Sequence, residues 1–251
     1  MATIDYYERL TEEYNLNNIP LLVASGVSFA VGYMQYVYAI RVLLREGNGP
    51  IPFWMHSFYL AHDSTWSYIL GRVASRYEEH WFLRGTSTAL FVWTTLEIFC
   101  IHRSITKTRN ACFASVLGPN PSLAVVLPYA AFLQMAMYCV VWFGIILMGE
   151  GCVMQWFCLT NVLIIVGTTH EYLRRGSRDG LALGFCLVNI ICAIWTFTPF
   201  SMWALTLPEI FAQPMYYCAG CFMFLYSLWA FYIVYSYPAK KPSKTDPSPI
   251  W

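Results

Sequence analysis

Charged residues are scarce in this 251-residue chain: Asp, Glu, Lys and Arg together make up 12% of it, against 58% hydrophobic residues. An ordinary soluble domain carries about 25% charged residues. So little charge cannot cover a water-soluble globule, and disordered chains are poor in hydrophobic residues. The net charge of +1 also lacks the clustered positive charge that nucleic-acid binding requires. These shortages exclude a soluble enzyme, a disordered chain and a nucleic-acid binder, and they indicate an integral membrane protein.

Signatures of disulfide, metal and nucleotide sites are missing as well. The nine cysteines are an odd number, and most lie in apolar runs, where cysteine acts as a small hydrophobic residue. Cys218 and Cys221 form a CxxC, but no second CxxC and no suitably placed histidine accompany them. The sequence has no HExxH helix, no Asp-rich magnesium–diphosphate cluster and no phosphate-binding glycine loop. We therefore expect neither a metal nor an organic cofactor.

Long apolar runs are abundant. A transmembrane helix needs roughly 20 apolar residues to cross a hydrocarbon core about 30 Å thick. Seven stretches qualify: about 20–44, 52–73, 81–102, 122–148, 153–173, 180–203 and 215–237. The predicted fold is all-α, a polytopic membrane protein with seven transmembrane helices in one bundle and a single domain over 1–237.

The two ends of the chain differ from the apolar runs. The segment ERLTEEYN, Glu8–Asn15, predicts a short amphipathic helix lying at the membrane interface. The segment 238–251 has four prolines and three lysines, which is typical of a disordered tail.

The basic residues are distributed unevenly between the two expected faces of the membrane. With a lumenal N-terminus, eleven lie on the cytoplasmic side and four on the lumenal side. Cytoplasmic loops carry an excess of Lys and Arg, so we expect a lumenal N-terminus and a cytoplasmic C-terminus. The expected location is the endoplasmic reticulum membrane. The eleven are Arg41, Arg45, Arg103, Lys107, Arg109, Arg174, Arg175, Arg178, Lys240, Lys241 and Lys244, and the four are Arg9, Arg72, Arg76 and Arg84.

Asp63 is the strongest functional candidate. It lies 11 residues beyond Pro52, or roughly 16 Å along the helix axis, which is close to mid-membrane. An ionisable side chain there costs at least about 2.5–3.5 kcal/mol. His56, Tyr59 and Trp66 share its helix face by their 3–4-residue spacing. That face offers an acid, a relay and an aromatic wall to a substrate; the alternative is a buried Asp that only hydrogen-bonds neighbouring helices.

Glu97 is the second candidate. It lies 16 residues past Trp81, about 24 Å along the third helix, which places it near the depth of His56. Two carboxylates on adjacent helices at nearby depths can face one pocket and act as general acid and general base. In the alternative, Glu97 pairs with Arg103 or meets water at the interface.

Two histidines and the deep aromatic residues complete the set of candidates. His62 points about 100° away from Asp63 on the same helix and fits a core histidine as well as a catalytic one. His170 lies at the cytoplasmic end of the fifth helix. Trp66 and Trp93 lie beyond any interfacial belt and suit a carbocation or a polarised epoxide through cation–π attraction, or simple helix packing.

Two short motifs carry a resemblance to a known family. They are HDSTW (His62–Trp66) on the second helix and an Arg-Gly-Ser-Arg-x-Gly turn (Arg175–Gly180) after the fifth. With the chain length and seven spans, they resemble the small integral membrane cyclases of fungal secondary metabolism. One branch, the meroterpenoid and indole-diterpene cyclases, protonates an epoxide and folds a prenyl chain into rings. The other branch, the ascofuranone-type cyclases and the epoxide hydrolases of the aurovertin and citreoviridin type, opens an epoxide to form a cyclic ether.

The departures from that pattern favour the epoxide-to-ether branch. The carbocyclising branch typically has a Glu preceded by Trp on helix two and a second acid on the last helix. Here the helix-two acid is Asp63, its Trp66 follows it, and 215–237 contains no acidic residue. Glu97 or Glu209 would have to replace the missing acid.

The resemblance implies an enzyme that opens an epoxide on a lipophilic polyene, polyketide or prenylated substrate. Asp63 would donate a proton to the epoxide oxygen or hold the group that does, and Glu97 would accept the proton of the attacking hydroxyl or water. A histidine, His62 or His170, would serve as relay. The expected substrate contacts are His56, Tyr59, Trp66 and Trp93.

Two other functions stay open. One is a protonation-initiated carbocyclising cyclase, and the other is a non-enzymatic proton-coupled carrier, which would also use intramembrane carboxylates. A retinal protein is disfavoured because 215–237 contains no lysine for a Schiff base. The partners expected in each case are the lipid bilayer and a lipophilic small molecule, with no nucleic acid.

Overall fold

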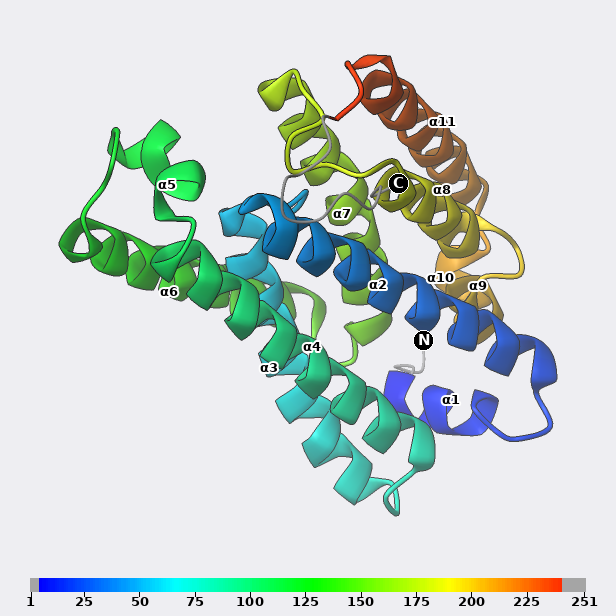
Figure 1. Cartoon of the computed structure of the whole chain (residues 1–251). Coiled ribbons are helices and arrows are strands. Elements are labelled where there is room, and N and C mark those ends of the chain that lie inside the picture. Colours follow the sequence, from blue (N-terminus) through cyan, green and yellow to red (C-terminus); the bar gives the residue numbers. More distant parts are fainter. Residues whose placement is uncertain (1–4, 241–251) are drawn as a thin grey trace. The chain divides into compact units, whose positions relative to one another are not determined.

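The computed structural model describes residues 5–240, and every regular element within that range is a helix (Figure 1). The chain divides into two compact units. Unit 1 comprises Met1–Asn18 and Phe53–Phe157, and unit 2 comprises Ile19–Pro52 and Cys158–Trp251. The greater part of the predicted tail, 241–251, lies outside the described residues.

Each of the seven predicted apolar stretches coincides largely with one of the longer helices. The helices are α2 (Ile19–Glu46), α3 (Phe53–Arg76), α4 (Trp81–Thr106), α6 (Leu123–Met148), α7 (Val153–Arg175), α8 (Leu183–Phe197) and α11 (Pro214–Ser236). Four shorter helices accompany them: α1 (Tyr6–Glu13), α5 (Arg109–Leu117), α9 (Met202–Thr206) and α10 (Pro208–Phe211).

Five helical stretches among the described residues are long and apolar enough to cross a membrane. They are α2, α6, α7, α11 and the stretch Leu183–Thr206, which contains α8 and α9. The helices α3 and α4 are not among them. The structure is therefore all-α with several membrane-compatible helices, and the count of seven spans stays a prediction.

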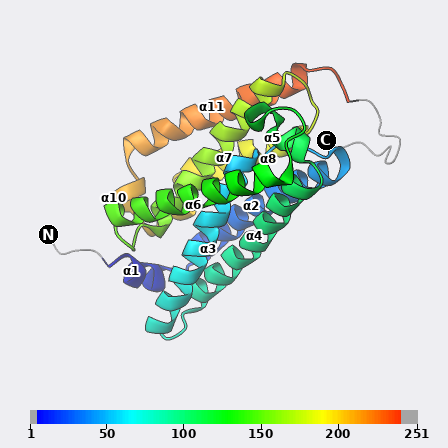
Figure 2. The same cartoon turned by 90° about the vertical axis from the view of Figure 1, so that its left-hand side faces the viewer.

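Helix α3 is the interior helix of unit 1. Of its 24 residues, 15 are buried, and its main neighbours are α4 and α6. The helices α3 and α4 lie side by side as an antiparallel hairpin (Figures 1 and 2). Two reciprocal hydrogen bonds fasten the hairpin: Ser67 Oγ donates to the Ser87 carbonyl (2.8 Å), and Ser87 Oγ donates to the Ser67 carbonyl (2.7 Å). The buried polar residues of α3, among them His56, His62 and Asp63, therefore face protein.

Helix α1 forms where the sequence predicts the amphipathic segment. Asp5 caps its N-terminus by accepting hydrogen bonds from the backbone N–H groups of Tyr7 (3.0 Å) and Glu8 (3.2 Å). Such a cap satisfies N–H groups that have no partner within the helix. Tyr7 and Leu10 are buried, so one face of α1 packs against the rest of unit 1.

Three hydrogen bonds tie α1 and the residues on either side of it to the α3–α4 turn, to the first residue of α4 and to the α6–α7 turn. Tyr77 Oη donates to Asp5 Oδ2 (2.9 Å), Trp81 Nε1 donates to the Tyr14 carbonyl (3.0 Å), and Tyr7 Oη donates to the Glu150 carbonyl. The α3–α4 turn and the α6–α7 turn therefore lie at the same end of unit 1 as α1. At the start of α3, Phe53 packs with Phe113 of α5 and with Val126 and Ala130 of α6.

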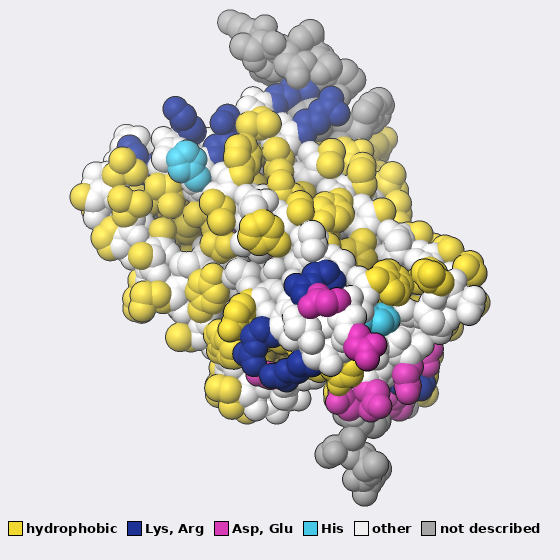
Figure 3. All heavy atoms as spheres, turned by 90° about the horizontal axis from the view of Figure 1, so that it is seen from below, with side chains coloured by type: hydrophobic (Ala, Val, Ile, Leu, Met, Phe, Trp, Pro, Cys, Tyr) yellow, Lys and Arg dark blue, Asp and Glu magenta, His cyan; other side chains and the backbone are white. Residues whose placement is uncertain are grey.

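Unit 2 is built around α8, which packs against α2 and α11. Two glycines allow these close approaches. A Cβ at Gly184 would lie 2.4 Å from the Tyr38 ring of α2, and a Cβ at Gly220 of α11 would lie 2.2 Å from Phe197 Cβ. Apolar side chains elsewhere point outward, as they do in membrane proteins: among them are Phe132 (75% exposed) of unit 1 and Met215 (77%) of unit 2. Figure 3 shows hydrophobic side chains spread over one face, with charged side chains in small groups.

Candidate functional site

The centre of the candidate site is a carboxylate–histidine pair on α3. Asp63 Oδ1 lies 2.7 Å from His62 Nδ1, and both residues are buried, at 5% and 1% exposure. Their backbone positions are about 100° apart around the helix, but the two side chains lean toward each other. A carboxylate in this place accepts the Nδ1 proton and fixes which nitrogen of the imidazole stays available.

The other imidazole nitrogen, His62 Nε2, has no hydrogen-bond partner among the described residues. Aromatic rings surround this imidazole. Its centroid lies 5.8 Å from that of Trp156, 6.0 Å from that of Phe157 and 6.2 Å from that of Phe58. His62 therefore presents a free proton-accepting nitrogen in an apolar setting.

Trp156 and Phe157 were not predicted as site residues. They lie in the first residues of α7, far from α3 in the sequence, so no spacing rule connects them to His62. The position of Trp156 depends on Gly144 of α6, since a Cβ at Gly144 would lie 2.3 Å from Trp156 Cζ2. A glycine in the highly apolar run of α6 was the only sequence signal for this contact.

Glu97 of α4 pairs with His56 of α3. His56 Nδ1 lies 2.5 Å from Glu97 Oε2, and Glu97 is fully buried. Glu97 lies level with His56 along the α3–α4 hairpin, and its carboxylate is held by that histidine. Because His56 and Asp63 are seven residues apart, the two carboxylate–histidine pairs are separated by about 10 Å along α3.

The other predicted residues are dispersed. Tyr59 and Trp66 are buried on α3, at 6% and 0% exposure, and Trp93 is half-buried on α4, one turn before Glu97. His170 is an exposed residue of α7 in unit 2, whereas the two pairs belong to unit 1.

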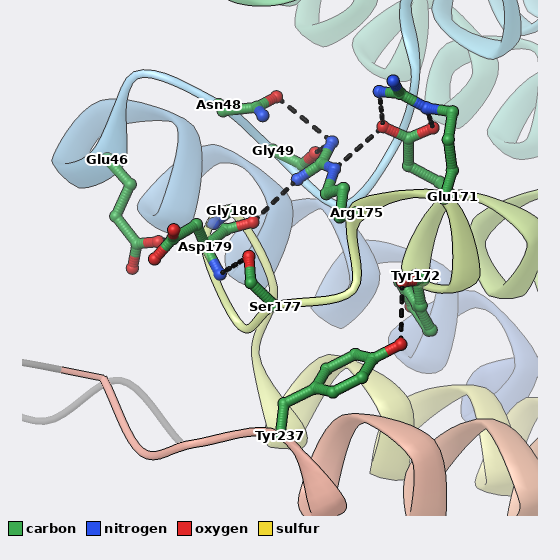
Figure 4. A network of polar contacts seen from close by, with 11 residues as sticks. Glu46, Asn48, Gly49, Glu171, Tyr172, Arg175, Ser177, Asp179, Gly180 and Tyr237 are labelled. Carbon is green, nitrogen blue, oxygen red and sulfur yellow. Dashed lines mark hydrogen bonds and ion pairs between the residues drawn. The ribbon is translucent and has the colours of Figure 1, made fainter.

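Glu171, next to His170, belongs to a polar network in unit 2 (Figure 4). Its carboxylate accepts hydrogen bonds from Arg174 Nε (2.8 Å) and Arg175 Nε (2.8 Å). Arg175 also donates to Asn48 Oδ1 (3.1 Å) and to the Gly49 carbonyl (2.7 Å). This network accounts for Glu171 as an ion-pair partner.

The Arg-Gly-Ser-Arg-x-Gly turn is a structural tie in unit 2. Arg175 begins the turn and holds the segment that follows α2, as described above. Arg178 Nε donates to the Val234 carbonyl near the end of α11 (2.8 Å), and the backbone N–H of Gly180 donates to Glu46 Oε2 of α2 (2.7 Å). Gly180 has a φ of +72°, which favours glycine. The turn thus joins α2, α7 and α11.

Within residues 5–240, no group of three or more His, Cys, Asp and Glu side chains is arranged to hold a metal ion. Comparison of the chain with models of protein families, with curated proteins and with solved structures found no match.

Proposed function

We propose that this protein is a membrane-embedded acid–base enzyme that opens an epoxide on a lipophilic substrate. The observation that carries the proposal is the His62–Asp63 pair, with Nδ1 held at 2.7 Å and Nε2 unpartnered among the described residues. An imidazole oriented by a carboxylate is a common arrangement for proton exchange with a reacting group. The rings of Phe58, Trp156 and Phe157 suit the apolar body of such a substrate.

His62 is the group that exchanges protons in this proposal. Its Nε2 accepts the proton of the attacking hydroxyl or water as the new C–O bond forms. The same proton then passes to the oxygen freed by epoxide opening, so His62 ends as it began. Asp63 orients the ring and stabilises the imidazolium between the two transfers.

Glu97 receives a different role from the one that the sequence favoured. An acid and a base that act on one epoxide must both reach the reacting atoms, which lie about 3 Å apart. The His62–Asp63 and His56–Glu97 pairs, however, are separated by about 10 Å along α3. We therefore assign His56 and Glu97 to holding α3 against α4.

All seven long helices cross the membrane in this proposal, with the N-terminus lumenal. Chain continuity and the α1 contacts support it. If α2 crosses the membrane, α3 begins on the side opposite to α1. The end of α3 nevertheless lies beside α1, because Tyr77, which follows α3, donates a hydrogen bond to Asp5, which precedes α1. Helix α3 must then cross back, and α4 must return. The charge asymmetry of the loops supports the orientation, and the sequence resemblance supports the endoplasmic reticulum as the location.

The direct test is conversion of a synthetic terminal epoxide of a linear prenyl chain by membranes that contain the protein. Asp63→Asn and His62→Gln should insert at normal abundance and lose about 10²–10⁴-fold in turnover, the usual contribution of a positioned acid–base group. His102→Gln is the matched control, because His102 is an exposed histidine of α4. It should convert the epoxide at the wild-type rate.

Two outcomes would redirect the proposal. Full conversion by abundant Asp63→Asn protein would remove the pair from the chemistry. A wild-type protein that converts no epoxide but couples proton movement to solute uptake in vesicles would replace the enzyme with a carrier, and the same variants would then identify the proton site.

A further inference from the structure

Three basic residues lie close together where α4 passes into α5, in unit 1. Arg103 and Lys107 are one helical turn apart at the end of α4, and Arg109 begins α5 two residues later. Residues one turn apart are neighbours on a helix surface, and two residues span at most about 7 Å of chain. The chain also turns tightly here, because the backbone N–H groups of Lys107 and Thr108 both donate to the Arg103 carbonyl (2.9 and 3.2 Å). We call Arg103, Lys107 and Arg109 the α4–α5 cluster.

No acidic side chain neutralises the α4–α5 cluster within residues 5–240. The sequence has neither Asp nor Glu between Glu97 and Glu150, and every salt bridge in this part of the chain lies elsewhere. Glu97 is held by His56. The Nε atom of Arg103 is buried and has no hydrogen-bond partner among the described residues. Because buried polar atoms are almost always hydrogen-bonded, this nitrogen indicates a ligand that the described chain does not supply.

The basic residues that end α7 in unit 2 are used differently. Arg174 and Arg175 donate to the carboxylate of Glu171, and Arg178 donates to the Val234 carbonyl. Those arginines are engaged in holding the fold of unit 2. The charge of the α4–α5 cluster is instead available to an anion from outside the chain.

Exposed apolar side chains continue from the cluster along α5 and into α6. They include Val116 of α5, which is 61% exposed, and Leu123 and Val125 in the first turn of α6. Helix α6 is long and apolar enough to cross a membrane. Cationic groups near exposed apolar side chains at the end of such a helix suit the interface between lipid headgroups and acyl chains.

We infer that the α4–α5 cluster binds the phosphate of an anionic phospholipid, whose acyl chains lie against the exposed apolar side chains of α5 and α6. Guanidinium groups bind phosphate oxygens through charge-assisted hydrogen bonds, and lysine adds a point charge. A soluble anion or an acidic protein segment would match the charge but would leave Val116, Leu123 and Val125 in water. In the proposed orientation the cluster faces the cytoplasmic leaflet, which holds the anionic lipids.

This inference goes beyond the proposed function, because it concerns a lipid that stays bound and is not converted. Phe113 of α5 is buried, and its ring centroid lies 4.5 Å from that of Phe53, the first residue of α3. A lipid that holds α5 in place therefore also braces the start of α3. Binding should accordingly be visible as an increase in thermal stability.

The experiment measures the melting temperature of the purified protein in neutral detergent. The added probes are short-chain phosphatidylserine, short-chain phosphatidylcholine, inorganic phosphate and a polyglutamate peptide. Phosphatidylserine should raise the melting temperature in a saturable way, and the other three should not.

The variant Arg103→Gln/Lys107→Gln/Arg109→Gln tests the cluster itself. Each basic residue near an anionic surface strengthens binding about fivefold, so this variant should bind phosphatidylserine about 10²-fold more weakly. The matched control Arg41→Gln/Arg72→Gln/Arg76→Gln removes the same charge at three exposed arginines outside the cluster. It should keep the wild-type affinity.

Equal affinity of the cluster variant and the wild type would overturn the inference. An equal shift with inorganic phosphate would identify a soluble anion as the ligand, and an equal shift with polyglutamate would identify an acidic protein; either result would also overturn it. Lys107→Gln alone, at an exposed position, should bind about fivefold more weakly and decides if the triple variant does not fold. Since the assay measures binding and not turnover, its outcome is independent of the epoxide chemistry.

Discussion

Asp63 and Glu97 are both buried carboxylates beside a histidine of α3, yet their surroundings differ in a way that matters for chemistry. Asp63 bonds to its own neighbour, His62, and the far nitrogen of that ring is unpartnered among the described residues. Glu97 joins two helices through His56. A histidine–carboxylate pair that exchanges protons with a substrate needs a ring nitrogen that is not already hydrogen-bonded. A pair that holds two helices together needs only a strong contact between its own two members. Residue type and helix position were visible in the sequence, but the direction of each side chain was not.

Glu97→Gln should lower stability more than turnover. A buried hydrogen bond to a charged group contributes about 1.5–3 kcal/mol, and the amide leaves a weaker neutral bond to His56. We expect a lower melting temperature in detergent, with turnover per folded molecule within about threefold of wild type, far less than the loss of an acid–base group. Unchanged stability with a loss of about 10²–10⁴-fold would instead restore Glu97 as the general base.

Gly144→Ala should disturb the site from α6. The added methyl would lie 2.3 Å from Trp156 Cζ2, and overpacking of this kind costs about 1–3 kcal/mol. The ring of Trp156 must move relative to His62, so both thermal stability and epoxide turnover should fall. Gly85→Ala in α4 is the matched control, because nothing lies within 4 Å of its added Cβ. It should be neutral or stabilising by about 0.5–1 kcal/mol, and equal behaviour of the two variants would contradict the Trp156 contact.

At the scale of elements, the apolar runs were sufficient to predict where the long helices form, because length and hydropathy are local properties. The predicted helix at 8–15 also forms, although its start depends on the Asp5 cap, one turn earlier. The ties between elements were not predictable. The contacts of α1 with both turns join residues that are distant in sequence, and the contact of Trp156 with Gly144 joins two consecutive helices; both follow from packing alone.

The attachment of α1 should weaken in acid. Burial raises the pKa of Asp5, but hydrogen bonds from Tyr77 and from the backbone of Glu8 and Tyr7 outweigh it, and the net pKa is lowered. A carboxyl group whose pKa is lowered by folding stabilises the folded state at pH values above its ordinary pKa of about 4. This stabilisation is lost as the pH falls through the pKa of the folded state. Wild-type protein should therefore lose melting temperature below about pH 4.

Asp5→Asn is the informative control for that loss. Asparagine caps a helix nearly as well as aspartate but does not titrate. The variant should show a shallower fall in melting temperature with acid than wild type. Identical slopes would mean that Asp5 does not contribute to the pH dependence.

At the scale of the whole molecule, tags on the two termini should lie on opposite faces of the membrane. The excess of basic residues predicts a cytoplasmic C-terminal tag and a protected N-terminal tag in sealed microsomes. This holds for five spans or seven, because α3 and α4 form a hairpin and are added or removed together. Both tags on one face would refute the orientation.

Labelling of the α3–α4 turn separates five spans from seven. Glu78 is exposed in that turn, and a membrane-impermeant maleimide should reach Glu78→Cys only after the microsomes are opened. Lys107→Cys, exposed after α4, should be labelled in sealed microsomes, with the wild-type cysteines as background. Labelling of Glu78→Cys in sealed microsomes would mean that the hairpin does not cross.

The enclosed position of α3 has a consequence for how the protein is made. The insertion machinery admits nascent segments to the lipid largely by their own hydrophobicity, and an Asp at the middle of a helix opposes entry. Helix α3 is outside the set of helices apolar enough to cross alone, and its inward face matches α4 through the reciprocal bonds of Ser67 and Ser87. In the proposed seven-span arrangement, the emerging α3 therefore stays at the insertion site until α4 has been synthesised, and the two helices enter the bilayer together as one hairpin.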